Sequence, residues 1–135
     1  YKTKTFRFHA GDSRIYLMRD GGLRRLTMDH SLRESGNQPN APTNMITNSL
    51  GGGKNTFIEF AEIEQPFINN DIYLLCSDGL HGIVSVGDII DALLLPETEP
   101  NEAYAKKLLA LAKAAGGKDN ISIITIKTCN AEEQL

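Results

Sequence analysis

A continuous apolar run from Ile72 to Cys76 constrains the fold more than any other feature of the sequence. Such a run is typical of a β-strand that is covered on both faces, because an exposed face carries polar residues at every second position. The chain has 135 residues, and a chain of this size buries roughly two thirds of the surface that its unfolded form exposes. We therefore expect one domain with a core large enough to cover this strand.

Alternation of polar and apolar residues predicts several further strands. Asp20-Gly21-Gly22 joins two of them in a hairpin, because glycine readily adopts the positive φ of a tight hairpin turn. Between positions 29 and 55 the composition shifts to Ser, Asn, Gln, Pro and Gly, which predicts a long surface loop. The predicted strands are Thr5–His9, Arg14–Arg19, Leu23–Thr27, Thr56–Ile63, Ile72–Ser77 and Ile121–Lys127.

Two helices are predicted in the second half of the chain. Ser85 and Asp88 have the spacing of a capping box, apolar residues follow at helical spacing, and Pro96 marks the end. The second helix extends over about 101–115, because one stripe of its surface is apolar and Gly116-Gly117 can end it. Residues 130–135 are predicted to form a polar tail.

Charge and cysteine content argue against several classes of function. The sequence has 14 Lys and Arg against 17 Asp and Glu, a formal net charge of −3, whereas a nucleic-acid-binding surface needs clustered positive charge. No apolar run approaches the roughly 20 residues that cross a bilayer, so we expect no membrane segment. Cys76 and Cys129 lie far apart in the sequence, which favours reduced thiols and a cytoplasmic protein over a disulfide framework.

Three aspartates at the ends of predicted strands are candidate metal ligands. Asp78 follows the buried strand, Asp119 precedes the last strand, and Asp12 follows Gly11 where the first strand is interrupted. Carboxylates at a rigid sheet edge suit hard divalent cations. The alternative is that each residue only forms a turn, since Asp and Gly are common turn residues. Spacing alone does not decide between the two.

The three histidines are weaker candidates for metal binding. His9, His30 and His81 are spread along the chain without the spacing that is typical of a metal site. We expect each of them to be a polar residue of a loop or a strand end.

Five segments form an ordered series of motifs that contain glycine or aspartate. They are Gly11–Leu17, Leu26–Ser31, Leu50–Gly52, Asp71–Leu80 and Gly116–Ser122. In this order they closely resemble the motifs of the metal-dependent protein phosphatases, the PPM or type 2C family. The resemblance covers the chain from about Phe6 to Lys127 and is to the C-terminal half of that catalytic domain. It implies an α+β fold that is part of a four-layer α-β-β-α sandwich with antiparallel sheets.

The resemblance also implies a site and a reaction. Asp78 and Asp119 correspond to two aspartates that hold a binuclear Mn²⁺ or Mg²⁺ centre, and Asp12 to one that helps to hold a weaker third ion. The metals activate a water molecule that attacks phosphoserine or phosphothreonine in a phosphoprotein, so no side chain acts as a nucleophile. The implied function is a serine/threonine protein phosphatase in signalling. The residues that support the metal-binding loops are Gly79, Asn120 and Gly11.

The chain lacks motifs that the other half of the family's domain supplies. These are an acidic residue near its start, an Asp-Gly-x-Gly-Gly segment whose Asp bridges both metals, and an Arg that grips the phosphate. We therefore expect the chain to act as part of a longer catalytic domain and to be inactive, or nearly so, alone. The alternative is a non-catalytic pseudophosphatase or phosphoprotein-binding module.

The beginning of the chain supports the expectation of a longer protein. Tyr1 opens a strand-like alternation without an initiator Met, so the missing N-terminal half is an expected partner. Strands that lose their neighbours leave open sheet edges, and open edges pair with other chains. Self-association through such edges is a further expectation.

Overall fold

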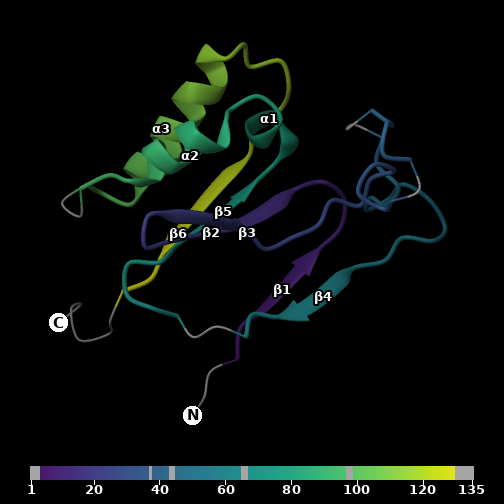
Figure 1. The fold of residues 1–135 in the computed structure, drawn as a ribbon, viewed down its shortest axis with the longest axis horizontal. Coiled ribbons are helices and arrows are strands. Elements are labelled where there is room, and N and C mark those ends of the chain that lie inside the picture. The colour runs from purple at the N-terminus through teal and green to yellow at the C-terminus, as the bar shows by residue number, and fades with distance from the viewer. Residues whose placement is uncertain (1–3, 37, 43–44, 65–66, 97–98, 130–135) are drawn as a thin grey trace. The chain divides into compact units, whose positions relative to one another are not determined.

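The computed structural model describes residues 4–36, 38–42, 45–64, 67–96 and 99–129. These residues divide into two compact units. The ribbon unit comprises Tyr1–Ser13 and Thr27–Pro66, and the sheet unit comprises Arg14–Leu26 and Phe67–Leu135. The strands are β1 (Phe6–His9), β2 (Arg14–Arg19), β3 (Gly22–Arg25), β4 (Glu59–Glu62), β5 (Ile72–Cys76) and β6 (Ile123–Lys127), and the helices are α1 (Asp78–His81), α2 (Val86–Leu93) and α3 (Glu102–Ala114) (Figure 1).

The sheet unit is built on a four-stranded antiparallel sheet with the strand order β3-β2-β5-β6. The apolar run lies inside this sheet, because β5 pairs with β2 on one side and with β6 on the other. All residues of β5 except Leu75 are buried, as a strand covered on both faces requires. The predicted hairpin joins β2 to β3, with positive φ at Asp20 and Gly21.

A single apolar cluster joins this sheet to the helices, which lie against one of its faces (Figure 1). Leu74 of β5 belongs to the cluster together with Leu80, Ile89 and Leu108, one residue from each helix. Each of these four side chains is at most 1% exposed. Burial of this kind is the main stabilising term of the unit, at about 25 cal/mol per Å² of apolar surface removed from water.

The helix ends follow the predicted signals. The Ser85 hydroxyl accepts a hydrogen bond from the Asp88 N–H (3.1 Å) and donates one to the Asp88 carboxylate (2.6 Å), so this pair caps α2. At the end of α3, Gly117 has a φ of 52° and its N–H donates to the Ala112 carbonyl (3.1 Å). This positive φ is the conformation that glycine permits at a helix C-terminus.

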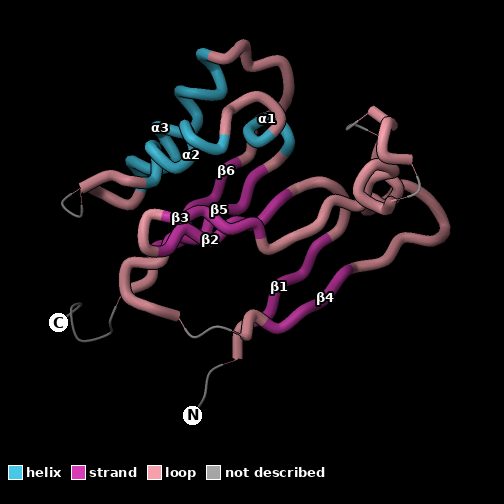
Figure 2. The backbone as a smooth tube through the Cα atoms, viewed as in Figure 1, coloured by secondary structure: helices cyan, strands magenta, loops and turns pink. Residues whose placement is uncertain are grey.

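The ribbon unit contains the two-stranded antiparallel pair β1 and β4 and most of the long predicted loop (Figure 2). The register places His9 opposite Glu59. Because side chains alternate along a strand, Arg7 shares the face of His9 and Glu59. The other face carries three packed and exposed aromatic rings, those of Phe6, Phe8 and Phe60.

One local prediction was wrong, and one short helix was not predicted. The strand predicted from Thr56 forms only from Glu59, because the Asn48 side chain bonds both backbone groups of Phe57 and removes them from strand pairing. At Asp78, where the sequence left a simple turn as the alternative to a metal ligand, the chain forms the short helix α1, in which the Leu80 and His81 N–H groups donate to the Ser77 carbonyl. His81 therefore ends a helix. The predicted strand Arg14–Arg19 has the observed bounds, and the remaining predicted strands differ from the observed ones by one or two residues at one or both ends.

The described residues also bear on two of the exclusions. None of the helices formed by them is long and apolar enough to cross a membrane. Within the same ranges neither Cys76 nor Cys129 is part of a disulfide. The predicted polar tail at 130–135 lies outside the described residues.

Candidate functional site

Two loops of the sheet unit that carry candidate aspartates are bonded to each other. The Ser77 hydroxyl donates to the Asn120 carbonyl (3.1 Å) and accepts from the Ser122 N–H (3.0 Å), and the Ser77 N–H donates to the Ser122 carbonyl (3.1 Å). Ser77 precedes Asp78, and Asn120 follows Asp119. The end of β5 and the loop before β6 are thus held side by side, each with one aspartate.

Gly79 explains how closely these loops approach. A Cβ atom built at this position would lie 2.2 Å from the Asn120 carbonyl oxygen, a distance that real Cβ atoms do not adopt. Any side chain at position 79 would therefore push the two loops apart. The sequence predicts Gly79 and Asn120 as supporting residues. They can lie next to each other because Gly79 has no side chain.

The donor set of these loops suits a hard divalent cation. Asp78 is partly exposed at the first residue of α1, and Asp119 is exposed, with one carboxylate oxygen accepting from the Asn120 N–H (2.7 Å). Exposed carboxylate oxygens on a rigid sheet edge are ligands that Mg²⁺ and Mn²⁺ accept. The residues present therefore fit such an ion, although the assignment of Asp78 and Asp119 as ligands stays a prediction.

The third predicted aspartate belongs to the ribbon unit. Asp12 is partly exposed and follows Gly11, which is buried and has a φ of 99°. A φ in this region is one that glycine adopts and other residues avoid. The Gly11–Asp12 corner is thus a sharp backbone turn, as the interruption of the alternation predicts.

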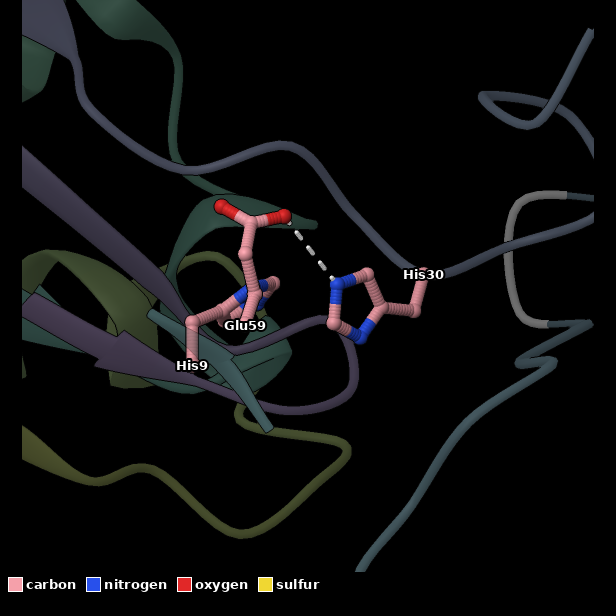
Figure 3. A group of neighbouring side chains, drawn as sticks. All are labelled: His9, His30 and Glu59. Carbon is pink, nitrogen blue, oxygen red and sulfur yellow. Dashed lines mark hydrogen bonds and ion pairs between the residues drawn. The ribbon is translucent and has the colours of Figure 1, made fainter. Parts of the chain in front are cut away.

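The ribbon unit also brings together three residues that no sequence pattern connects: His9, His30 and Glu59 (Figure 3). Their potential ligand atoms lie within 4.8 Å of one another. His9 and Glu59 lie opposite each other in the strand register. The centroid of the His30 ring, from the long loop, lies 4.5 Å from that of the His9 ring. His30 Nε2 is 3.4 Å from a Glu59 carboxylate oxygen. We call these three residues the histidine cluster.

The charges of the histidine cluster are set by burial and by one another. Burial lowers the pKa of His9, and the negative charges of Glu59 and Asp29 oppose this shift. Burial raises the pKa of the Glu59 carboxyl, but hydrogen bonds from Arg7 and His30 outweigh it and lower the pKa overall. The cluster therefore combines an uncharged His9 with an ionised Glu59 near neutral pH. Both ring nitrogens of His9 are buried and have no hydrogen-bond partner among the described residues.

Two histidines and a glutamate are ligand types that suit zinc, but hydrogen bonding argues against a metal at His30. The Asn48 amide is oriented by Phe57, whose N–H donates to Asn48 Oδ1 (3.2 Å) and whose carbonyl accepts from Asn48 Nδ2 (2.8 Å). The same Nδ2 donates to His30 Nδ1 (2.8 Å), as does the Gly11 N–H (3.2 Å). His30 Nδ1 thus faces two donors and carries no proton, so Nε2 carries it and has no lone pair for a metal.

Sequence reasoning missed this cluster for a geometric reason. Its residues come from β1, β4 and the loop between β3 and β4, separated by up to 50 positions, and no spacing rule joins them. The alternation in β1 and β4 indicated which face each residue would take, but only the register shows that His9 lies opposite Glu59.

Comparison with known proteins identifies related sequences. Over 128 residues the chain is 34% identical to the serine/threonine protein phosphatase PstP of Mycobacterium tuberculosis. This match covers 86% of the chain and 23% of PstP. Over 132 residues it is 32% identical to the serine/threonine phosphatase Stp of Listeria monocytogenes, covering 88% of the chain and 50% of Stp. The chain thus spans half or less of the length of these curated relatives. No protein-family model matches it.

Solved structures share the fold. The serine/threonine phosphatase of S. agalactiae superposes with a TM-score of 0.78 at 28% identity, over 93% of this chain and 54% of that one. The catalytic domain of PstP in complex with two manganese ions superposes with a TM-score of 0.74 at 32% identity, over 96% of this chain and 56% of that one. These likenesses confirm the predicted α+β fold with antiparallel sheets.

Proposed function

The chain is related in sequence and in fold to the bacterial serine/threonine phosphatases of the PPM type, and we propose that it supplies part of the catalytic domain of such an enzyme. The complete domain hydrolyses phosphoserine and phosphothreonine in phosphoproteins. The chain spans about half the length of Stp, and alone it is inactive or nearly so.

The observation that carries this proposal is the bonding between the Asp78 loop and the Asp119 loop. Ser77 makes three hydrogen bonds to the segment that follows Asp119. In the proposal Asp78 and Asp119 are ligands of a binuclear Mn²⁺ or Mg²⁺ centre, and Asp12 helps to hold a weaker third ion. When bound, such ions lower the pKa of a coordinated water molecule and neutralise negative charge on phosphoryl oxygens.

The remaining residues of the two loops act by holding the carboxylates in place. Ser77 fixes the backbone on the N-terminal side of Asp78, and Gly79 permits the close approach on the other side. Supports of this kind matter because metal ligands that are displaced by a fraction of an ångström bind less tightly. Ser77, Gly79 and Asn120 therefore serve the site without touching the substrate.

We further propose that the partner of this chain is the remaining half of the catalytic domain. A divalent ion such as Mg²⁺ takes about six oxygen ligands, more than the candidate aspartates provide. Exposed apolar side chains support a partner surface in each unit. In the sheet unit Ile124 and Ile126 of β6 are 58% and 51% exposed, and in the ribbon unit the aromatic face of β1 and β4 is exposed.

Without that half, the sheet edges favour self-association. β3 and β6 are the outer strands of the four-stranded sheet among the described residues, and unpaired edges recruit other chains. Light scattering of the isolated chain at high concentration should show dimers or larger species, and a strict monomer would contradict this. A cytoplasmic location and the lack of a nucleic-acid or membrane partner stay predictions from the sequence.

The test is hydrolysis of p-nitrophenyl phosphate and of a phosphothreonine peptide with added Mn²⁺. Three samples are compared: the chain alone, the chain mixed with the remaining half of the domain, and the same mixture with Asp78→Asn. Asp91→Asn is the matched control, because Asp91 is an exposed residue of α2.

Activity in the mixture that Asp78→Asn abolishes and Asp91→Asn preserves would support the proposal. A well-folded mixture without activity would contradict it and would favour a non-catalytic pseudophosphatase that binds phosphoproteins.

A further inference from the structure

The sharp turn that leads into Asp12 is held on both sides by a single residue, His30. The Gly11 N–H donates to His30 Nδ1 (3.2 Å), and the His30 N–H donates to the Gly11 carbonyl (2.8 Å). These groups belong to the two peptide units that flank the Gly11 Cα atom. Holding both units fixes the rotation about Gly11, a residue that would otherwise be the most freely rotating in the turn.

His30 is itself firmly placed. Its carbonyl accepts from the Thr47 N–H (2.8 Å), Asn48 Nδ2 donates to its Nδ1, and Nε2 donates to Glu59, which Arg7 holds from the other side. Its side chain is 9% exposed. A ring fixed at both nitrogens and at the backbone provides a rigid support for the turn.

We propose that His30 is a positioning residue for Asp12, acting through Gly11 by its unprotonated Nδ1. We call this arrangement the His30 clamp. The inference rests on the proposed function, because it takes Asp12 as a metal ligand of the complete domain. It assigns to the histidine cluster a role in setting the metal site, in place of binding a metal of its own.

Two substitutions of His30 test the contributions of Nδ1 and Nε2 separately. His30→Asn keeps an acceptor at the position of Nδ1 and loses the group that meets Glu59. His30→Gln reaches the position of Nε2 and loses the acceptor for the Gly11 N–H. The His30 clamp requires only the Nδ1 end of the ring, whereas packing of the histidine cluster depends on both ends.

The first measurement is independent of catalysis. In the mixture of both halves, with ¹⁵N in this chain only, NMR reports which His30 nitrogen is protonated and how fast the Gly11 amide exchanges. We expect the proton on Nε2, and a Gly11 amide that exchanges much more slowly than that of Gly53, an exposed loop glycine. A proton on Nδ1, or an unprotected Gly11 amide, would overturn the clamp even if the mixture is an active phosphatase.

The second measurement is the Mn²⁺ concentration that gives half the maximal rate of p-nitrophenyl phosphate hydrolysis. His30→Gln should raise it about tenfold, as loss of a support behind a metal ligand does, and saturating Mn²⁺ should restore the rate. His30→Asn should stay within about twofold of the unmodified mixture, and Asp12→Asn should behave like His30→Gln.

The outcomes distinguish the two proposals. Equal effects of His30→Asn and His30→Gln, or a loss that saturating Mn²⁺ does not restore, would overturn the positioning role. An unmodified mixture without activity would contradict the proposed function, while the NMR measurement still decides whether the His30 clamp exists.

Discussion

In the sheet unit a buried apolar cluster joins the sheet to the helices, whereas the buried residues of the ribbon unit are mostly polar. The sheet unit buries side chains such as Leu74, Leu80 and Leu108 completely. Among the described residues of the ribbon unit, the buried polar ones are His9, Thr27, Asp29, Ser31 and Asn48. The two units therefore obtain their structure from different interactions.

The difference concerns how specific each interaction must be. An apolar cluster tolerates changes that conserve volume, because contact between apolar groups has no required direction. A buried hydrogen-bonded cluster is stable only if each donor meets an acceptor, since an unpaired buried group costs about 1–3 kcal/mol. Stability should thus depend most on the sheet unit, and the geometry of the Gly11–Asp12 turn on the ribbon unit.

The largest effect is expected from Leu74→Ala in the sheet unit. Leu74 is 0% exposed, and a cavity of this kind lowers the free energy of unfolding by about 3–4 kcal/mol. Urea denaturation followed by circular dichroism measures it. Leu94→Ala, at a position 56% exposed, is the matched control and should cost less than about 1 kcal/mol. Equal losses in the two variants would show that the apolar cluster does not dominate stability.

The next largest effect is expected at an ion pair of the sheet unit. Arg19 donates through Nε and a terminal nitrogen to the two oxygens of Asp71 (2.8 and 2.6 Å), and the Asp71 side chain is 1% exposed. Asp71→Ala leaves Arg19 without its carboxylate partner and should cost about 3 kcal/mol. The exposed residue Asp91 offers the control Asp91→Ala, which should change stability by less than about 0.5 kcal/mol.

Acid should weaken the same ion pair. Hydrogen bonds from Arg19 lower the pKa of the Asp71 carboxyl, against the opposing effect of burial. Its contribution to stability is therefore complete above the pKa of the unfolded chain, about 4, and is lost as pH falls through the lower pKa of the folded state. Denaturation between pH 2 and 6 should show a shallower acid loss in Asp71→Ala, and parallel curves would contradict this.

A smaller effect is expected from Asn48→Ala in the ribbon unit. The substitution removes the partners of both Phe57 backbone groups and one of the two donors to His30 Nδ1, which should cost about 2 kcal/mol. Asn55→Ala, in an exposed part of the same loop, should change stability by less than about 0.5 kcal/mol. An equally small loss of stability in Asn48→Ala and Asn55→Ala would contradict the proposed role of buried hydrogen bonds in the ribbon unit.

The smallest effect is a pH dependence at His9. Burial lowers the pKa of His9, while the negative charges of Glu59 and Asp29 act in the opposite direction. The unfolded chain thus binds more protons than the folded chain between the lowered pKa and about 6.5, so stability rises with pH in that window and is level above it. His9→Asn should flatten the rise, as denaturation at pH 5 to 8 would show. If stability still rises with pH in His9→Asn, the pH dependence comes from another titratable group.

Particular elements show how far sequence reasoning reaches. The buried strand β5, the hairpin after β2, the capped start of α2 and the glycine end of α3 follow from local signals in a few consecutive residues. The shortened β4 does not, because Asn48 takes the backbone groups of Phe57 from nine positions away. A pattern of neighbouring residues does not show that a side chain nine positions away will take these backbone hydrogen bonds.

The same limit separates the two parts of the candidate site. The order of the motifs pointed to Asp78 and Asp119, and the fold places their loops side by side through Ser77. The histidine cluster has no such motif order, because strand register and loop closure bring its members together. Its hydrogen-bond directions, which distinguish a clamp on Gly11 from a zinc site, exist only in three dimensions.

Neighbouring residues and their order are enough to indicate the apolar pattern, most of the strands, the ends of α2 and α3, and the likeness to a phosphatase family. The folded chain alone shows how closely Gly79 approaches Asn120, which atom of His30 meets Gly11, and which polar groups are buried together. The physical reason is that apolar burial is nondirectional and can be read from spacing, whereas a hydrogen bond requires a distance and an angle between atoms that folding alone brings together.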